Sequence, residues 1–427
     1  MDPAGTHVAE LEPLLRTAIF KPANELIGQV LQQAADRVDA AYQPKPGQRR
    51  MARESLLVHC MFGSFTLQRD YYYHPGKKSG HFPADAALGL EGHDSPALAR
   101  LICLEGADES SYHKASTHLL EVGGIEVDER RIQRVVQRVG EDASEWQKRE
   151  SFPQPCDARV LYISADATGV PMRREELEDR KGKGPDGIAK TRMATLGCVF
   201  TQHKEDEQGM PMRDHESSTY LSGFESPSDF GIGLRREAIR RGLFTAREIV
   251  FLVDGAPGLE KLGRDYFPTA TQIVDCYHAM EHLQQVIDLL LGKDHPSLVK
   301  RRRHHWKKLL LADGVERIIA QARREALGRG KAPEVEAALG YFLNNLERMR
   351  YGTFRAKGFF IGSGVIEAGC RSVIGQRCKQ SGMFWSVLGA QDILALRCIH
   401  ASRRSDWFWK DRLNAHAAKN DRLPFAA

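Results

Sequence analysis

The stretch that decides the fold reads RVLYISAD and covers residues 159–166. It is a short apolar run that ends at Asp166, as expected for a buried strand that delivers a carboxylate to the edge of a sheet where the chain turns. The run IVFLVDG at 249–255 reaches Asp254 in the same way, and QIVD at 272–275 reaches Asp275. We therefore expect carboxylates at the ends of central strands, where open α/β sheets bind their ligands.

The segments around these runs complete the predicted core. Further strands are expected over 194–201 and 218–223, and a helix over 226–241. Residues from about 290 to 350 lack strand patterning. The resulting order of strands and helices predicts an α/β fold, an RNase H-like mixed sheet with a helical insertion before its last helix.

The sequence ahead of this core changes character twice. Residues 56–73 alternate as a strand pair would, with a break at Gly63-Ser64. From Asp94 the pattern predicts three short helices, and the last of them carries several arginines. Three helices with a basic last one are typical of a helix-turn-helix module, although a plain helical connector fits the same pattern.

These observations predict six segments, with one boundary marked by Pro153 and Pro155. They are an N-terminal region of uncertain role at 1–90, a small helical, helix-turn-helix-like domain at 91–152, the first part of the core at 153–290, the helical insertion at 291–355, the last part of the core at 356–412, and a tail at 413–427.

Composition excludes several classes of protein. The chain has 427 residues, of which 42% are hydrophobic, so it can build a sizeable core. No window offers the run of about 20 apolar residues that crosses a bilayer, and the start of the chain lacks the pattern of a signal peptide. Its eight cysteines form no C-x-x-C pair, which indicates reduced thiols rather than a zinc ribbon. We expect a cytoplasmic enzyme.

A third carboxylate, Glu367, follows a glycine-rich turn that Ser363 is placed to cap. Alone, Glu367 is better explained as the partner of Arg371, four residues later on a helix. Alone, Asp166 and Asp254 are each explained equally well as turn or helix-cap residues. Together they favour a metal site, because two like charges at about 4 Å cost roughly 4 kcal/mol at an effective dielectric of 20.

Carboxylates are hard oxygen donors that suit Mg²⁺ or Mn²⁺. Two such ions, about 3.5 to 4 Å apart, bind both the attacking and the leaving oxygen of a phosphodiester displacement. We therefore expect Asp166, Asp254 and Glu367 to be catalytic residues that hold two ions.

Basic residues are concentrated in a few places, although the net charge is only +5. Such clusters suit a polyphosphate partner such as double-stranded DNA, while a solvated helix face explains any single one of them equally well. Trp306 in the insertion has two interpretations, packing inside it or stacking on an extruded base. The expected DNA-binding residues are Arg180, Lys181, Lys183, Arg301, Arg302, Arg303, Trp306, Arg371, Arg377 and Lys379.

Three strings carry a family resemblance: ISADATGVPMR at 163–173, VDCYH at 274–278 and GSGVIEAGC at 362–370. They resemble bacterial insertion-sequence transposases of the ISKra type over residues from about 90 to 410. The resemblance implies a DDE triad at Asp166, Asp254 and Glu367, an RNase H-like fold, DNA transposition, and action near the nucleoid. Asp275 and His278 match a D-x-x-H signature of related transposases, with an expected role in supporting the metal site.

The chain departs from that family in one respect and allows two rival functions. Members often carry a cysteine-rich segment ahead of the helical domain, and residues 72–81 hold no cysteine. His278 and His282 fit the H-x-x-E-H pattern of a zinc metalloprotease. A transposase-derived protein that binds DNA without cutting it is the other alternative. Moving both ends of an element implies a homodimer or larger assembly on DNA.

Overall fold

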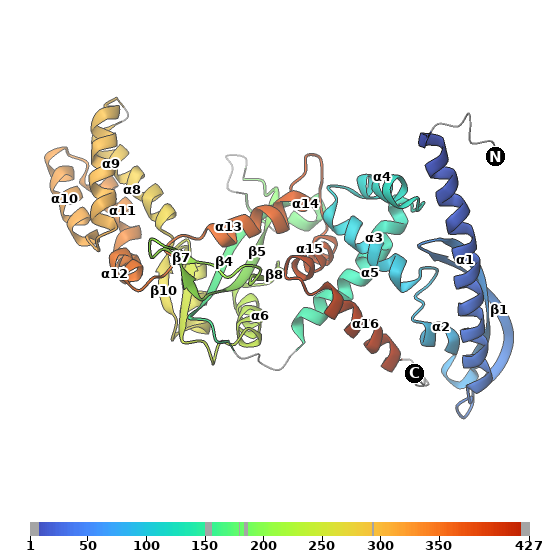
Figure 1. Ribbon diagram of the computed structural model, residues 1–427. Coiled ribbons are helices and arrows are strands. Elements are labelled where there is room, and N and C mark those ends of the chain that lie inside the picture. The colour runs from blue at the N-terminus through green and yellow to red at the C-terminus, as the bar shows by residue number, and fades with distance from the viewer. Residues whose placement is uncertain (1–7, 150–155, 179, 183–186, 293, 420–427) are drawn as a thin grey trace. The chain divides into compact units, whose positions relative to one another are not determined.

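The computed structural model describes residues 8–149, 156–178, 180–182, 187–292 and 294–419 (Figure 1). The chain forms two compact units, one from residues up to 143 together with those from 404 onward, and one from residues 144–403. Within the described ranges, no helix is long and apolar enough to span a membrane. Each unit has its own core and is described by itself.

The first unit contains a long helix, α1 (Val8–Ala41), which lies along a hairpin of β1 (Arg49–Cys60) and β2 (Gly63–His74). The predicted strand pair is confirmed: β1 and β2 are antiparallel and meet at the turn between Cys60 and Gly63. Leu31 and Ala35 of α1 pack into a small core with the hairpin. The other elements are β3 (Ser79–His81), α2 (Pro83–Leu88), α3 (Pro96–Asp108), α4 (Tyr112–Gly123), α5 (Glu129–Lys148) and α16 (Ser405–Lys419).

The second unit is built on a five-stranded mixed sheet with the order β10-β9-β4-β5-β8. The central strand β4 runs antiparallel to β5 and parallel to β9, while β5 is antiparallel to β8 and β9 is parallel to β10. Because β9 lies between two parallel neighbours, the carboxyl ends of β9 and β10 share one edge. The bounds are β4 (Val160–Pro171), β5 (Thr191–Gln202), β8 (Thr219–Gly223), β9 (Glu248–Val253) and β10 (Thr271–Val274).

Helices cover this sheet. α6 (Pro227–Arg240) and α7 (Pro257–Tyr266) enclose a core with inward residues of β4 and β9, including Ile163 and Phe251. Elsewhere, α13 (Gly364–Gly369) contacts β4 and β5, and α15 (Val387–Ala401) contacts β8. Gly369 permits the close approach of α13, since a Cβ there would lie 2.8 Å from the Tyr220 ring.

A helical group lies between β10 and α13 in sequence, seen in yellow to orange in Figure 1. It starts with α8 (Cys276–Leu291), and α8, α9, α10 and α11 pack against one another. No strand occurs among its described residues. The other helices are α9 (Pro296–Leu310), α10 (Val315–Gly328), α11 (Ala332–Asn344) and α12 (Tyr351–Ala356).

Candidate functional site

Asp166 lies inside a strand, and the expectation that the chain turns there is wrong. β4 continues to Pro171 because β5 pairs with it along its whole length, and Asp166 faces Leu196 in that ladder. On its other side, β4 pairs with β9 only as far as Ser164. Asp166 is therefore the second residue beyond the point where β9 stops pairing, and it is half-buried at that edge of the sheet.

Asp254 directly follows β9, as its sequence pattern predicts. One of its carboxylate oxygens accepts the amide of Ala256 at 2.8 Å, and its carbonyl oxygen accepts the hydroxyl of Tyr341 at 2.9 Å. The next residue, Gly255, has φ +85°, and a Cβ there would lie 3.0 Å from the same hydroxyl. A glycine is thus needed for the backbone to leave the strand beside Tyr341.

Asp275 follows β10 and is fully buried, and its carboxylate connects two elements. Oδ1 accepts the backbone amide of His278 at 2.7 Å and so caps α8. Oδ2 accepts the backbone amide of Ser363, just ahead of α13. The Cys276 amide also donates to the carbonyl of Ile361, at 2.9 Å. These bonds fix the start of α13 against the start of α8.

Glu367 lies on α13, one turn after Ser363, and is exposed. Ser363 stands at the N-cap position, but its hydroxyl donates to Glu367 Oε1 at 2.6 Å instead of capping the helix. After α13 the chain continues as a π-helical segment, Cys370–Gly375, and then α14 (Gln376–Cys378). Single π-helical turns inside helices often accompany functional sites, because they shift the side chains that follow.

The structure brings Glu367 together with the two residues expected to support it. The ligand atoms of Asp275, His278 and Glu367 all lie within 4.8 Å of one another. Asp166 and Asp254 do not belong to this group of three, although both act electrostatically on His278. Asp166 lies within β4, two residues beyond its last pair with β9, while Asp254 and Asp275 directly follow β9 and β10. The bonds of Asp275 to Ser363 and of Cys276 to Ile361 bring the start of α13 to this edge of the sheet.

The electrostatics of this edge follow from burial and crowding of like charges. Burial raises the pKa of Asp166, and the nearby charge of Asp254 adds to the increase. The amide of Ala167 and the thiol of Cys370 oppose it by hydrogen bonding to the Asp166 carboxylate. Burial lowers the pKa of His278, but the hydrogen bond and charge of Asp275 outweigh it, so the net shift is upward.

This donor set fits a divalent cation. In the group of Asp275, His278 and Glu367, the two carboxylates are oxygen donors that suit Mg²⁺ or Mn²⁺, and the imidazole of His278 suits Zn²⁺. Asp275 is less suited to direct coordination than the others, because two backbone amides already occupy its buried oxygens. It is better placed to orient Glu367 and His278.

The second histidine of the H-x-x-E-H pattern is engaged elsewhere. The ring of His282 stacks on Tyr341 with their centroids 3.6 Å apart and an interplanar angle of 18°. The group formed with Asp275 and Glu367 contains His278 and not His282. A metalloprotease needs both histidines on one ion, so this arrangement disfavours it.

Two of the expected DNA contacts are wrong for a physical reason. Trp306 is fully buried in the helical group, with its indole nitrogen donating to Gln321 Oε1 at 2.8 Å, so packing is the correct alternative. Arg377 is 1% exposed and lies over the Trp385 ring, with 4.9 Å between its guanidinium carbon and the ring centroid. Neither side chain can reach a phosphate.

The other expected DNA-binding residues differ in their exposure and in whether another side chain already pairs with their charge. Arg302 is half-buried and pairs with Glu325 at 2.5 Å. Lys379 is exposed, and its ammonium donates to the Thr168 hydroxyl, two residues from Asp166. Lys183 falls outside the described residues. Exposed side chains are those of Arg180, Lys181, Arg301, Arg303 and Arg371.

Two residues that contact the predicted triad carry no signal in the sequence. Tyr341 is a residue of α11 that reaches Asp254 across 87 positions of the chain. Cys370 reaches Asp166 from the π-helical segment. Only the fold brings these partners together, so a short motif cannot reveal them.

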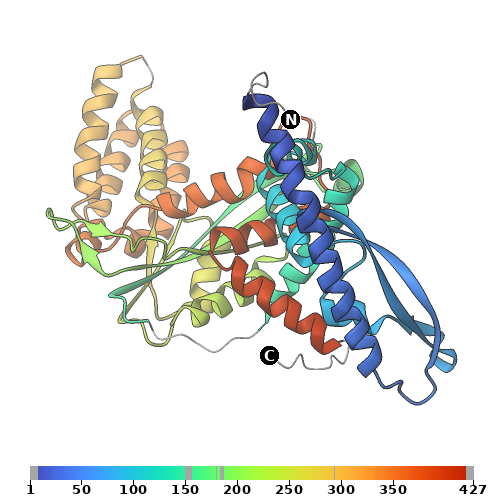
Figure 2. The same ribbon diagram turned by 45° about the vertical axis from the view of Figure 1, so that its right-hand side comes forward.

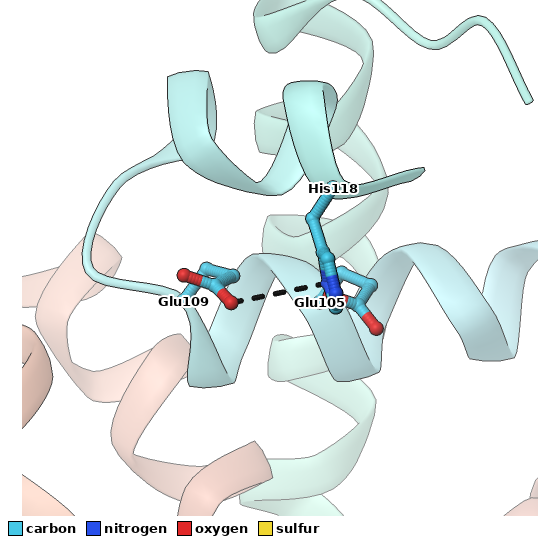
Figure 3. A group of neighbouring side chains, drawn as sticks. All are labelled: Glu105, Glu109 and His118. Carbon is cyan, nitrogen blue, oxygen red and sulfur yellow. Dashed lines mark hydrogen bonds and ion pairs between the residues drawn. The ribbon is translucent and has the colours of Figure 1, made fainter. Parts of the chain in front are cut away.

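A second group with metal-ligand chemistry lies in the first unit and consists of Glu105, Glu109 and His118. Figure 3 shows His118 of α4 directed toward the two glutamates at the end of α3, with Nδ1 2.5 Å from Glu105 Oε2 and 3.9 Å from Glu109 Oε1. Hydrogen bonding and the charge of Glu105 raise the pKa of His118. With His118 protonated, the group is an ion pair between α3 and α4, whereas a cation would bind the neutral ring.

The profile of the Uncharacterised protein family (UPF0236) matches residues 4–182, less than half of the chain. No curated protein matches the sequence. One similar solved structure is described as the Drosophila P element transposase strand transfer complex, at 12% identity and a TM-score of 0.25, covering 75% of this chain and 80% of that chain. A TM-score this low carries no argument about fold or function.

Proposed function

We propose that this chain is a DNA transposase of an insertion sequence, similar to the ISKra type, with an RNase H-like catalytic core. The observation that supports the proposal is the group of Asp275, His278 and Glu367, to which Asp166 and Asp254 are linked electrostatically through His278. The order of the sheet supports the fold, since two parallel strands lie on one side of β4 and an antiparallel meander on the other. The position of Glu367 on a helix after the helical group supports it as well.

The proposed reaction is two successive displacements at phosphorus. Water first attacks the phosphodiester at an element end and breaks the P–O3′ bond, which leaves a 5′ phosphate and a free 3′ hydroxyl. That hydroxyl then attacks a target phosphodiester and displaces the 3′ oxygen of the target strand, so one phosphodiester bond forms as another breaks. Asp166, Asp254 and Glu367 would hold two cations of the Mg²⁺ or Mn²⁺ type. When bound, such cations stabilise the negative charge that develops on the phosphate.

The other residues of the site would position these carboxylates. Asp275 and Ser363 restrict Glu367, the first through the backbone ahead of α13 and the second through a direct hydrogen bond. Tyr341 holds the backbone at Asp254. Fixed carboxylates reduce the reorganisation needed at the moment of reaction.

An assay with DNA tests this proposal. The purified chain is incubated with DNA that carries the element's own flanking sequences and a labelled 3′ end, with Mg²⁺, Mn²⁺ or chelator. We expect metal-dependent nicks that leave 3′ hydroxyls, followed by joined products. Binding of these ends without any cleavage in either metal would favour the binding-only alternative, and degradation of a casein substrate with Zn²⁺ would favour the protease.

The exposed cations of α9 are expected to contribute to DNA affinity by neutralising phosphates. Changing Arg301, Arg303, Lys307 and Lys308 to Ala removes four exposed charges. We expect the slope of log K against log salt to become shallower by roughly 3 to 4, about 0.9 for each phosphate that is no longer neutralised. Fluorescence anisotropy with duplex DNA at several salt concentrations measures it.

Arg302→Gln provides the matched control. Because Glu325 already neutralises Arg302, this change on the same helix should leave the slope nearly unaltered. An unchanged slope in the fourfold variant would remove α9 from the DNA interface.

A further inference from the structure

One face of α1 exposes four large aliphatic side chains in the first unit. Leu15, Ile19, Leu26 and Val30 are 58%, 65%, 62% and 54% exposed. At 100° per residue they fall within about 60° of the helix circumference, so they form one stripe. We name these four residues the outer seam.

The opposite face of α1 is the one that packs in the unit. Asn24 donates to the carbonyl of Ser64, and Leu31 and Ala35 join the core of the hairpin. These residues lie about 150° around the axis from the outer seam. Figures 1 and 2 show α1 lying along the β1–β2 hairpin. Packing of the unit's own core therefore does not explain why the outer seam is apolar, and a continuous exposed apolar stripe is typical of an interaction surface.

The spacing of the outer seam fits a second copy of the same helix. Its intervals are 4, 7 and 4 residues, from Leu15 to Ile19, to Leu26 and to Val30. This order reads the same in both directions. An antiparallel two-fold axis between Pro22 and Ala23 would place Leu15 against Val30 of the other copy, and Ile19 against its Leu26. Such self-complementarity is what a two-fold interface requires.

The charges on the same face favour the antiparallel over the parallel arrangement. Glu12 and Arg37 are exposed at opposite ends of the outer seam. In the antiparallel pair, Glu12 of one copy and Arg37 of the other lie about 6 Å apart along the helix axis, which is about one helical turn. Two side chains of this length can bridge that distance. Parallel pairing would set Glu12 against Glu12 and Arg37 against Arg37, which is unfavourable.

We propose that the outer seam of α1 joins two copies of this chain as an antiparallel homodimer. The proposal goes beyond DNA cutting and does not depend on it. The seam is only about 22 Å long, so the interface is small beside the ~1,600 Å² of a typical stable complex. The dimer should therefore form reversibly with concentration, in the absence of DNA.

A charge-exchange experiment on the full chain tests the proposal. In sedimentation velocity runs over a range of concentrations, the wild-type chain should shift from monomer to dimer. Ile19→Glu and Leu26→Lys should each weaken the dimer by about 100-fold or more, because each homodimer would bury two unpaired charges. Mixing the two variants should restore a dimer, because Glu at position 19 then faces Lys at position 26.

The results distinguish the antiparallel dimer from a monomer and from a dimer of another geometry. Lys21→Glu is the control, since it adds a carboxylate to α1 about 160° away from Ile19 and should leave the dimer intact. Far-UV circular dichroism verifies that the variants fold. A wild-type chain that stays monomeric, or variants that still dimerise alone, would overturn the interface. Failure of the mixture to dimerise, with both variants folded, would overturn the antiparallel pairing.

Discussion

Replacing Asp166 or Asp254 by Asn, or Glu367 by Gln, is expected to lower DNA strand cleavage by about 10²- to 10³-fold or more. Each change keeps the shape of the side chain but removes the negative charge that holds a cation. DNA binding should change far less, because the exposed cations proposed to contact phosphate are untouched. Single-turnover cleavage of labelled end DNA, with binding measured in parallel, separates the two effects.

Two further variants sharpen this experiment. Asp275→Asn should lower cleavage by about 10- to 100-fold, since an amide nitrogen cannot accept one of the two backbone amides that Asp275 now binds. Glu281→Gln changes an exposed carboxylate on the same helix as His278 and should have little effect. Near-normal cleavage by the Asp166, Asp254 or Glu367 variant would remove that residue from the proposed site.

The second large effect is expected for stability. Trp306→Ala should cost about 3 to 5 kcal/mol, the usual destabilisation when a large aromatic side chain is removed from a core. Trp306 is fully buried on α9, which packs against α8 and α10, and its indole bonds to Gln321. We expect faster hydrogen–deuterium exchange throughout α8, α9 and α10, together with a lower unfolding temperature.

Trp407→Ala is the matched control for this substitution, since Trp407 is 39% exposed and its removal should destabilise much less. If Trp306 instead served to stack on a base, Trp306→Ala would weaken DNA binding while exchange in α9 stayed slow. That result would contradict the packing described above.

The strands of the core were predictable because short apolar runs are a strong local signal. The runs at 249–255 and 272–275 place Asp254 and Asp275 directly after β9 and β10, as expected. The run at 159–166 gave a wrong strand end: the residues after Ala165 are small or polar and do not look like a buried strand, yet β4 continues to Pro171. Pairing with β5 maintains that strand, and pairing partners far along the chain leave no local trace.

Basic residues were less predictable, because their sequence does not tell which charges are satisfied inside the fold. Arg377 and Arg302 looked as available as Arg301, yet one is buried on Trp385 and the other pairs with Glu325. The outer seam of α1 also escaped prediction. Apolar residues on both sides of that helix hide the usual one-sided periodicity.

The central claim is that Asp166, Asp254 and Glu367 hold divalent cations at one edge of the sheet. Anomalous diffraction from crystals of the full chain grown with Mn²⁺ and end DNA tests it most directly. We predict Mn²⁺ peaks about 2.1 Å from oxygens of these three carboxylates. Mn²⁺ bound only by Asp275, His278 and Glu367, or only at Glu105, Glu109 and His118, with Asp166 and Asp254 unligated, would contradict the account.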